Sequence, residues 1–168
     1  MPKLVKDGAI VDNQWTLLEK PEGEPSAVNV PAGQVIVPLS VWQAQQDTLS
    51  QRNDVGVWLD SDETPDRLGD ALQALPLIAV NFPVFKDGRA FSSARLLRER
   101  YGYTGEVRAI GHFIRDQLCY LRRCGVNAFD FGAQEIDLEQ ALKSLNDFTE
   151  YYQAASDERL PLFRRRAS

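Results

Sequence analysis

The sequence predicts an α/β protein with a five-stranded, mainly parallel sheet, alternating helices and a small N-terminal β-hairpin. After residue 33, five apolar segments alternate with five segments of helical character. The apolar segments are nearly continuous, which is typical of parallel strands that are buried on both faces. The chain has 168 residues, of which 43% are hydrophobic and 26% charged, and this fits one domain with a single core.

The first 33 residues precede this alternation. Asp7-Gly8 is a tight-turn pair between short apolar segments, so we expect residues 1–18 to form a β-hairpin extension that stands apart from the core or packs on a second copy of the chain. Residues 15–18 are a candidate third short strand. Residues 19–33 contain three prolines and two glycines, which predicts a linker or a long surface loop.

Residues 34–150 are predicted to form the α/β domain. The expected strands are residues 35–39, 55–59, 77–82, 106–110 and 127–131. The expected helices are residues 40–52, a segment beginning at Thr64-Pro65, and residues 89–101, 113–124 and 137–148. Ser40 and Pro65 are favoured at helix starts, while Gly102 and Gly125 are typical of helix ends. Residues 151–168 are expected to be a frayed C-terminal tail.

Two closures of the sheet are consistent with this order of elements. One is an open, doubly wound sheet, and the other is a sheet curled like part of a β/α-barrel. A full barrel needs eight repeats, and the sequence has five.

Composition restricts the function. The net charge of −5 argues against general nucleic-acid binding, no apolar run is long enough to span a membrane, and the first residues lack the pattern of a secretory signal. We therefore expect a cytoplasmic protein. Cys119 and Cys124 are five residues apart, which does not suit a disulfide within one helix, so both are expected to be reduced.

Positive charge is concentrated in one segment. Residues 86–123 contain nine basic and four acidic side chains, an excess of five in a chain whose total is −5. This asymmetry predicts either a local positive field or a set of solvated helix faces.

Ligands of parallel α/β proteins bind near the carboxyl ends of the strands. Asp60 and His112 follow two predicted strands and are the candidates for catalytic proton transfer. The turn before the third long helix suggests an anion site, with Gly88, Arg89, Arg95 and Arg115 as candidate residues. The alternative is a helix capped by Asp87, with Arg95 and Arg98 facing water. Asp60 and Asp62 form only a weak divalent-metal pattern, so no metal site is predicted.

Several segments resemble the bacterial domain-of-unknown-function family 934, and the resemblance extends over nearly the whole chain. They are MPKLVKDG, VGVWLDSDE, LPLIAVNFPVFKDGRAFSSARLLRERYGYTGEVRAIG, RDQLCYLRRCGVNAF, YYQAA and PLFRR. Members of this family are often labelled oxidoreductases of sulfite reduction, because they are encoded beside the sulfite reductase haemoprotein. The resemblance implies a role in that process but transfers no catalytic residue.

These observations favour an accessory protein of assimilatory sulfite reduction, which docks a redox partner or handles an oxyanion through a basic surface. The alternatives are a small enzyme acting on an anionic metabolite at the sheet edge, and a catalytically inactive relative of β/α-barrels. The sequence contains no fingerprint for flavin, nicotinamide, haem or an iron–sulfur cluster, so no cofactor is predicted. The expected partners are the sulfite reductase haemoprotein and a small oxyanion; a homodimer also remains open.

Overall fold

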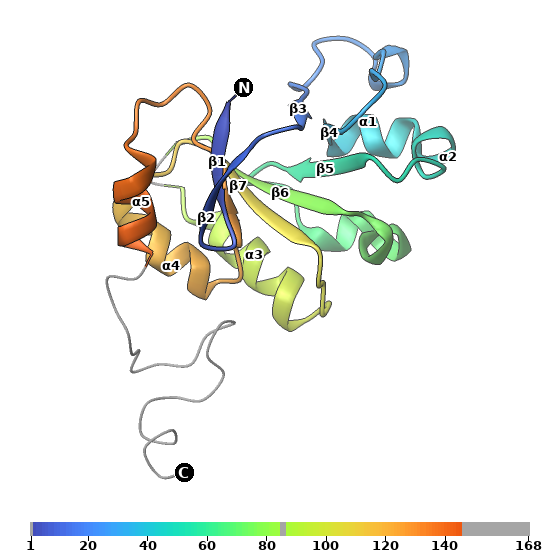
Figure 1. The fold of residues 1–168 in the computed structure, drawn as a ribbon. Coiled ribbons are helices and arrows are strands. Elements are labelled where there is room, and N and C mark those ends of the chain that lie inside the picture. The colour runs from blue at the N-terminus through green and yellow to red at the C-terminus, as the bar shows by residue number, and fades with distance from the viewer. Residues whose placement is uncertain (1, 85–86, 146–168) are drawn as a thin grey trace.

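The computed structural model describes residues 2–84 and 87–145, which form a curled eight-stranded sheet with helices (Figure 1). The α/β class is confirmed. The expected number of five strands is wrong, because the N-terminal hairpin and the short third strand join the same sheet. The predicted tail at residues 151–168 lies outside the described residues.

The strands follow one another in the sheet in the order β2-β1-β8-β7-β6-β5-β4-β3. Their bounds are β1 Lys3–Lys6, β2 Ala9–Asp12, β3 Thr16–Leu17, β4 Val35–Pro38, β5 Val55–Leu59, β6 Leu77–Phe82, β7 Glu106–Gly111 and β8 Ala128–Phe129. From β3 to β8 every neighbouring pair is parallel. The strand positions expected for β4 to β7 agree with the structure to within one residue at each end.

The helical segments are shorter and more irregular than the sequence predicts. Their bounds are η1 Pro25–Ala27, α1 Leu39–Ala44, α2 Gln46–Leu49, η2 Pro65–Ala74, α3 Arg89–Glu99, η3 Arg115–Gln117, α4 Leu118–Arg123 and α5 Leu138–Ser144. The segment predicted as one helix over residues 40–52 is divided at Gln45, and η2 is a 3₁₀-helix broken at Gly69, where φ is 58°. Asp137 accepts hydrogen bonds from the amides of Glu139 and Gln140, so it caps α5.

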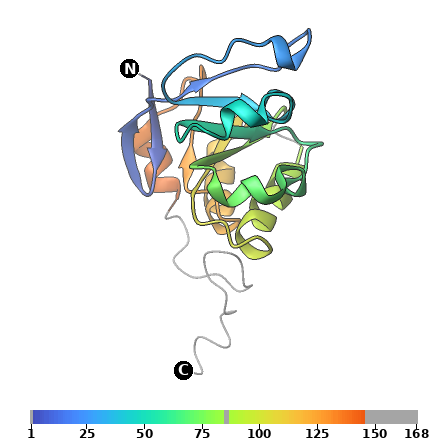
Figure 2. The same cartoon turned by 90° about the vertical axis from the view of Figure 1, so that its right-hand side faces the viewer.

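The strand order decides between the two closures. Strands β3 to β8 are neighbours in chain order, whereas a doubly wound sheet reverses its order at a switch point. Right-handed crossovers in one direction place all the connecting helices on the same face. Figure 2 shows the sheet from a second side, with helical segments in front of its strands. The sheet is therefore singly wound, like part of a β/α-barrel.

The connection between β2 and β3 shows how strongly the sheet is curled. Only three residues separate these strands, which occupy opposite ends of the strand order. Such a link spans at most about 14 Å. A flat sheet of eight strands would be about 34 Å wide. The two edges must therefore approach each other, and Figure 1 shows the link passing across the sheet.

The hairpin is part of the core, and the expectation that it stands apart is wrong. Strand β1 pairs antiparallel with β8, with Val5 opposite Phe129. Leu4 and Val5 are each only 1% exposed. A short hairpin is marginal by itself in water, so pairing and burial at the end of the parallel sheet stabilise it.

Alternate side chains of each strand lie on opposite faces of the sheet, so the apolar core consists of two clusters. On β6, Ile78 and Val80 pack in the larger core cluster, which also contains the buried residues of the helices. Leu77 and Ala79 belong instead to a smaller cluster with Ile36, Trp58, Ile110 and the partly buried Trp15. The smaller cluster fills part of the inner face of the curled sheet.

Other expectations concern single features. Neither Cys119 nor Cys124 forms a disulfide, as predicted, and both side chains are buried. The loop of residues 19–33 is held to the domain by side chains: Gln45 donates to the carbonyl oxygens of Pro25 and Val28, and Arg52 donates to those of Pro31 and Gly33. Within the described ranges, no helix has the length and apolar character needed to cross a membrane.

Candidate functional site

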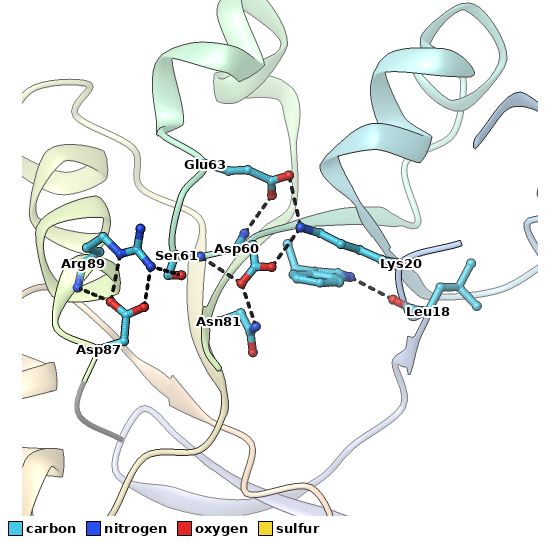
Figure 3. A network of polar contacts seen from close by, with 9 residues as sticks. Leu18, Lys20, Asp60, Ser61, Glu63, Asn81, Asp87 and Arg89 are labelled. Atoms are coloured by element: carbon cyan, nitrogen blue, oxygen red, sulfur yellow. Dashed lines mark hydrogen bonds and ion pairs between the residues drawn. The ribbon is translucent and has the colours of Figure 1, made fainter. Parts of the chain in front are cut away.

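Polar side chains gather where β3, β5 and β6 end (Figure 3). We call this set the rim network; it consists of Lys20, Asp60, Ser61, Glu63, Asn81, Asp87 and Arg89. The carboxyl ends of parallel strands share one edge of a sheet, which brings these residues together although they are up to 69 positions apart.

Asp60 is the centre of the rim network. Its Oδ2 accepts a hydrogen bond from Lys20 Nζ at 2.8 Å, and its Oδ1 accepts from Asn81 Nδ2 at 3.0 Å and from the Ser61 amide at 2.9 Å. Burial alone would raise the pKa of Asp60, but these hydrogen bonds together hold the pKa below its usual value. Asp60 is therefore an ionised anchor whose two oxygens are both engaged.

Lys20 follows β3, the first of the parallel strands, and its ammonium group binds the Asp60 carboxylate. Its Nζ also lies 3.6 Å from Glu63 Oε1 and 5.6 Å from the centre of the Trp58 ring. Trp58 in turn donates its indole N–H to the carbonyl oxygen of Leu18. Burial would lower the pKa of Lys20, but Asp60 and Glu63 raise it above the usual value, so the ammonium form is stabilised.

Asp60, which forms the weak divalent-metal pattern with Asp62, contacts Lys20 and Glu63 in the folded chain. Glu63 is buried, and its Oε2 accepts a hydrogen bond from the Asp60 amide at 2.8 Å. The Lys20 ammonium therefore lies against both Asp60 and Glu63 and balances part of their charge. Among the residues that the structure describes, no group of three His, Cys, Asp or Glu side chains is placed to bind a metal ion.

The predicted anion site begins at Gly88 and Arg89. Gly88 has a φ of −87°, so the turn does not require glycine. Arg89 forms two hydrogen bonds from its side chain to Asp87 and one to Ser61 Oγ, and its backbone amide also donates to Asp87. The Asp87 carboxylate thus occupies the position where an external anion would meet these donors.

The other candidates contact different neighbours. Arg95 pairs with Glu99 at 3.4 Å on the same helix, and Arg115 donates to Gln140 of α5. His112 is exposed, and its backbone amide donates to the Phe82 carbonyl oxygen. Anion binding at Gly88, Arg89, Arg95 and Arg115 stays a prediction, and so do catalytic roles for Asp60 and His112.

Two arginines of the basic segment have roles that the sequence did not indicate. Arg98 is half-buried and donates to the carbonyl oxygens of Tyr103, Gly105 and Gly125 at 2.7–2.9 Å, so the interpretation that it faces water is wrong. Arg108 is only 2% exposed and pairs with Glu106. The sequence could have indicated this pair, because Glu106 and Arg108 are two residues apart on a predicted strand. Side chains at that spacing lie on the same face of a strand.

A second set of candidate side chains comes from the segments that follow β6 and β7. Val84, Ile114 and Tyr120 are exposed apolar or aromatic side chains, with 56%, 45% and 49% of their surface accessible. The rings of Phe91 and Tyr120 contact each other across α3 and α4, with centroids 5.1 Å apart. Val84 and Ile114 follow the neighbouring strands β6 and β7 at one edge of the sheet, and we call Val84, Phe91, Ile114 and Tyr120 together the α3–α4 patch.

Positive side chains border the α3–α4 patch. Arg115 directly follows Ile114, and Arg95 lies close enough to Tyr120 to interact with it electrostatically. The patch thus combines exposed apolar and aromatic side chains with two neighbouring arginines, Arg95 and Arg115.

Comparison with known proteins places the chain in one family. No curated protein matches it. The family described as bacterial protein of unknown function (DUF934) matches residues 56–163, which include all of β5 but its first residue, β6 to β8, and every residue of the rim network except Lys20. The chain belongs to this bacterial family of unknown function, DUF934.

Proposed function

We propose that this protein is a non-catalytic accessory protein of sulfite reduction, which docks an acidic partner through the α3–α4 patch. The observation that carries the proposal is the exposure of Val84, Ile114 and Tyr120 beside arginines of the basic segment. Aromatic, apolar and arginine side chains are the groups that dominate the energetics of protein interfaces. The role in sulfite reduction rests on the family resemblance alone.

The state of Asp60, one of the two catalytic candidates, supports docking rather than catalysis. A general base needs an accessible proton acceptor with a pKa near the working pH. Both oxygens of Asp60 accept internal hydrogen bonds, and its pKa is held below the usual value, further from neutrality. The exposed His112 follows β7 at the same edge of the sheet, where its backbone amide donates to the carbonyl oxygen of Phe82 on β6.

The expected partner is the sulfite reductase haemoprotein, and binding of the two purified proteins tests the proposal directly. Tyr120→Ser and Ile114→Ser should each weaken binding about tenfold, the effect of removing one well-packed apolar anchor. Leu17→Ser is the matched control, because Leu17 is similarly exposed at 43% but lies on β3, at the other end of the sheet. Equal affinities for all four proteins, or no binding of the wild type, would exclude the proposal.

Charge provides an independent test of the same surface. Arg115→Glu should slow association and reduce the salt dependence of binding, because opposite charges steer the encounter of two proteins. Arg67→Glu is the control, since Arg67 is an exposed arginine on η2, outside the basic segment. If both variants change the association rate equally, only the net charge matters and the docking surface is elsewhere.

The rim network favours one alternative, a small enzyme acting on an anionic metabolite. Lys20 is 40% exposed and keeps an ammonium at the edge where β/α-barrels bind their substrates. Under this alternative, sulfite, sulfate or phosphate should stabilise the wild type in a saturable way, and Lys20→Met should abolish the effect. The docking proposal predicts the same thermal response for the wild type and the variant.

A further inference from the structure

Five polar side chains contact one another across the inner side of the curled sheet. Ile110, two residues after Arg108 on β7, belongs to the smaller apolar cluster, so Arg108 faces the same inner side. Only 2% of Arg108 is exposed. We call the five side chains the inner polar chain; they are Lys6, Glu106, Arg108, Asn13 and Asp130.

Each member of the inner polar chain contacts the next. Lys6 of β1 pairs with Glu106 Oε2 at 2.9 Å, and Glu106 Oε1 accepts a hydrogen bond from Arg108 Nε at 2.7 Å. Arg108 Nη1 donates to Asn13 Oδ1 at 3.1 Å, and Asn13 Nδ2 donates to Asp130 Oδ2 at 3.0 Å. The two cations and the two carboxylates of the chain balance each other, so every member has its partner inside the set.

Asn13 is the junction between the hairpin and the parallel strands. It is the first residue of the short link from β2 to β3, and its backbone amide donates to the carbonyl oxygen of Pro2 at 2.8 Å. Its Oδ1 also accepts from the backbone amide of Trp15 at 3.1 Å, and Trp15 packs against the smaller apolar cluster. One neutral side chain thus ties the link to β7 through Arg108 and to the end of β8 through Asp130.

The backbone holds the hairpin less firmly than it holds the parallel strands to one another. Strand β1 pairs with β8 at two successive residues, Val5 and Lys6, whereas β6 and β7 pair along their whole length. Side-chain contacts therefore contribute much of the attachment. A hydrogen bond to a charged, partly buried partner is stronger than one between neutral groups, and breaking it leaves that partner unsatisfied.

We propose that the inner polar chain is a latch that keeps the hairpin and the β2–β3 link closed over the inner side of the sheet. When Asn13 separates from Arg108 and Asp130, the hairpin and the link open, while the parallel strands stay folded. Such partial opening involves the part of a fold with the fewest stabilising contacts. The open form is rare while the latch is intact, so the hairpin still unfolds together with the parallel strands when the whole chain is denatured.

Hydrogen exchange of backbone amides, measured by NMR on the full ¹⁵N-labelled chain, tests the proposal. Amides of β1 and β2 report opening of the hairpin, and amides of β5 and β6 report unfolding of the whole domain. In Asn13→Ala the amides of β1 and β2 should exchange about tenfold faster than in the wild type, because opening no longer breaks the two side-chain hydrogen bonds of Asn13. Asn53→Ala is the matched control, since Asn53 is an exposed asparagine before β5 and should leave the exchange rates unchanged.

A second variant separates opening of the hairpin from unfolding of the domain. Val57 is buried in β5, in the larger core cluster. Val57→Ala should speed exchange in β5 and β6 but leave β1 and β2 unchanged, because the hairpin opens without disturbing β5. Equal acceleration in all four strands would show that the hairpin opens only when the whole domain unfolds, and this result would overturn the proposal.

Exchanging the two side chains at the junction tests the latch itself. Asn13→Asp alone should speed exchange in β1 and β2, because it places a carboxylate against Asp130. The double variant Asn13→Asp with Asp130→Asn should restore the wild-type rates, since the donor and the acceptor are only interchanged and Arg108 still has its acceptor. The proposal also fails if Asn13→Ala leaves the exchange of β1 and β2 unchanged, or if the double variant exchanges as fast as Asn13→Asp.

Discussion

At the scale of single residues, the arginines after β6 divide into several structural roles. Arg89 and Arg95 form exposed ion pairs, Arg98 binds three carbonyl oxygens and Arg108 is buried on the inner face. The charge of residues 86–123 therefore cannot be read as one uniform surface. Burial, rather than position along the chain, decides what each guanidinium does.

Arg98→Ala should reduce the free energy of unfolding by about 2–3 kcal/mol, since it leaves partly buried carbonyl oxygens without their charged donor. Arg95→Ala is the control on the same helix, and it should cost less than about 0.5 kcal/mol because its ion pair with Glu99 is exposed. Urea unfolding measures both values. Equal losses would show that Arg98 does not hold the loops together.

Asp60→Asn should make the free energy of unfolding depend less on pH under acidic conditions. The pKa of Asp60 is lower in the folded chain than its ordinary 3.8, so its contribution is present above that value and is lost as the pH falls through the folded pKa. Unfolding free energies measured between about pH 5 and 2 should therefore fall less steeply for the variant than for the wild type. Parallel profiles would contradict the rim network as described.

At the scale of elements, glycines end the helices where the sequence predicts. Gly102 and Gly125 have φ values of 61° and 105°. A side chain at Gly102 would meet open space, but at Gly125 a Cβ atom would collide with the Arg98 side chain. Glycine is thus required at Gly102 for the backbone conformation alone, and at Gly125 also for close packing against Arg98.

Gly125→Ala should therefore be more destabilising than Gly102→Ala. At Gly102 the left-handed backbone conformation should lower the free energy of unfolding by about 1 kcal/mol. At Gly125 the loss should be about 2 kcal/mol, because the Arg98 side chain must also move. Gly88→Ala should be nearly neutral, because Gly88 has a negative φ and its Cβ would meet Phe91 only at 3.9 Å. Thermal unfolding of the three variants gives the order, and a large loss at Gly88 would contradict it.

At the scale of the whole molecule, the hairpin and the parallel strands should unfold as one unit. Val5 of β1 is buried in the main core cluster and lies opposite Phe129 of β8. Removing its two methyl groups in Val5→Ala should cost about 2 kcal/mol. The loss should appear equally in the far-ultraviolet circular dichroism and in tryptophan fluorescence. A separate early transition of the hairpin would show that it is an independent unit.

The sequence by itself determined the local elements of this protein. Continuous apolar runs placed β4 to β7 within one residue, and helix-ending glycines and the Asp137 cap are properties of neighbouring residues. Such signals depend on backbone conformation and on burial, which a short segment expresses alone. The position of Asp60 at the edge of the sheet also followed from this order, because Asp60 stands directly after its strand.

Only the tertiary structure decided how these elements close and which side chains meet. The hairpin joins the sheet because its edge pairs with β8, more than one hundred positions away. Lys20 meets Asp60 across 40 positions, and Arg108 meets Asn13 across 95. These contacts depend on the curl of the sheet. The curl results from all the strand pairings together and from the short connection between β2 and β3. No single segment determines all of these pairings, so the rim network could be identified only in the folded chain.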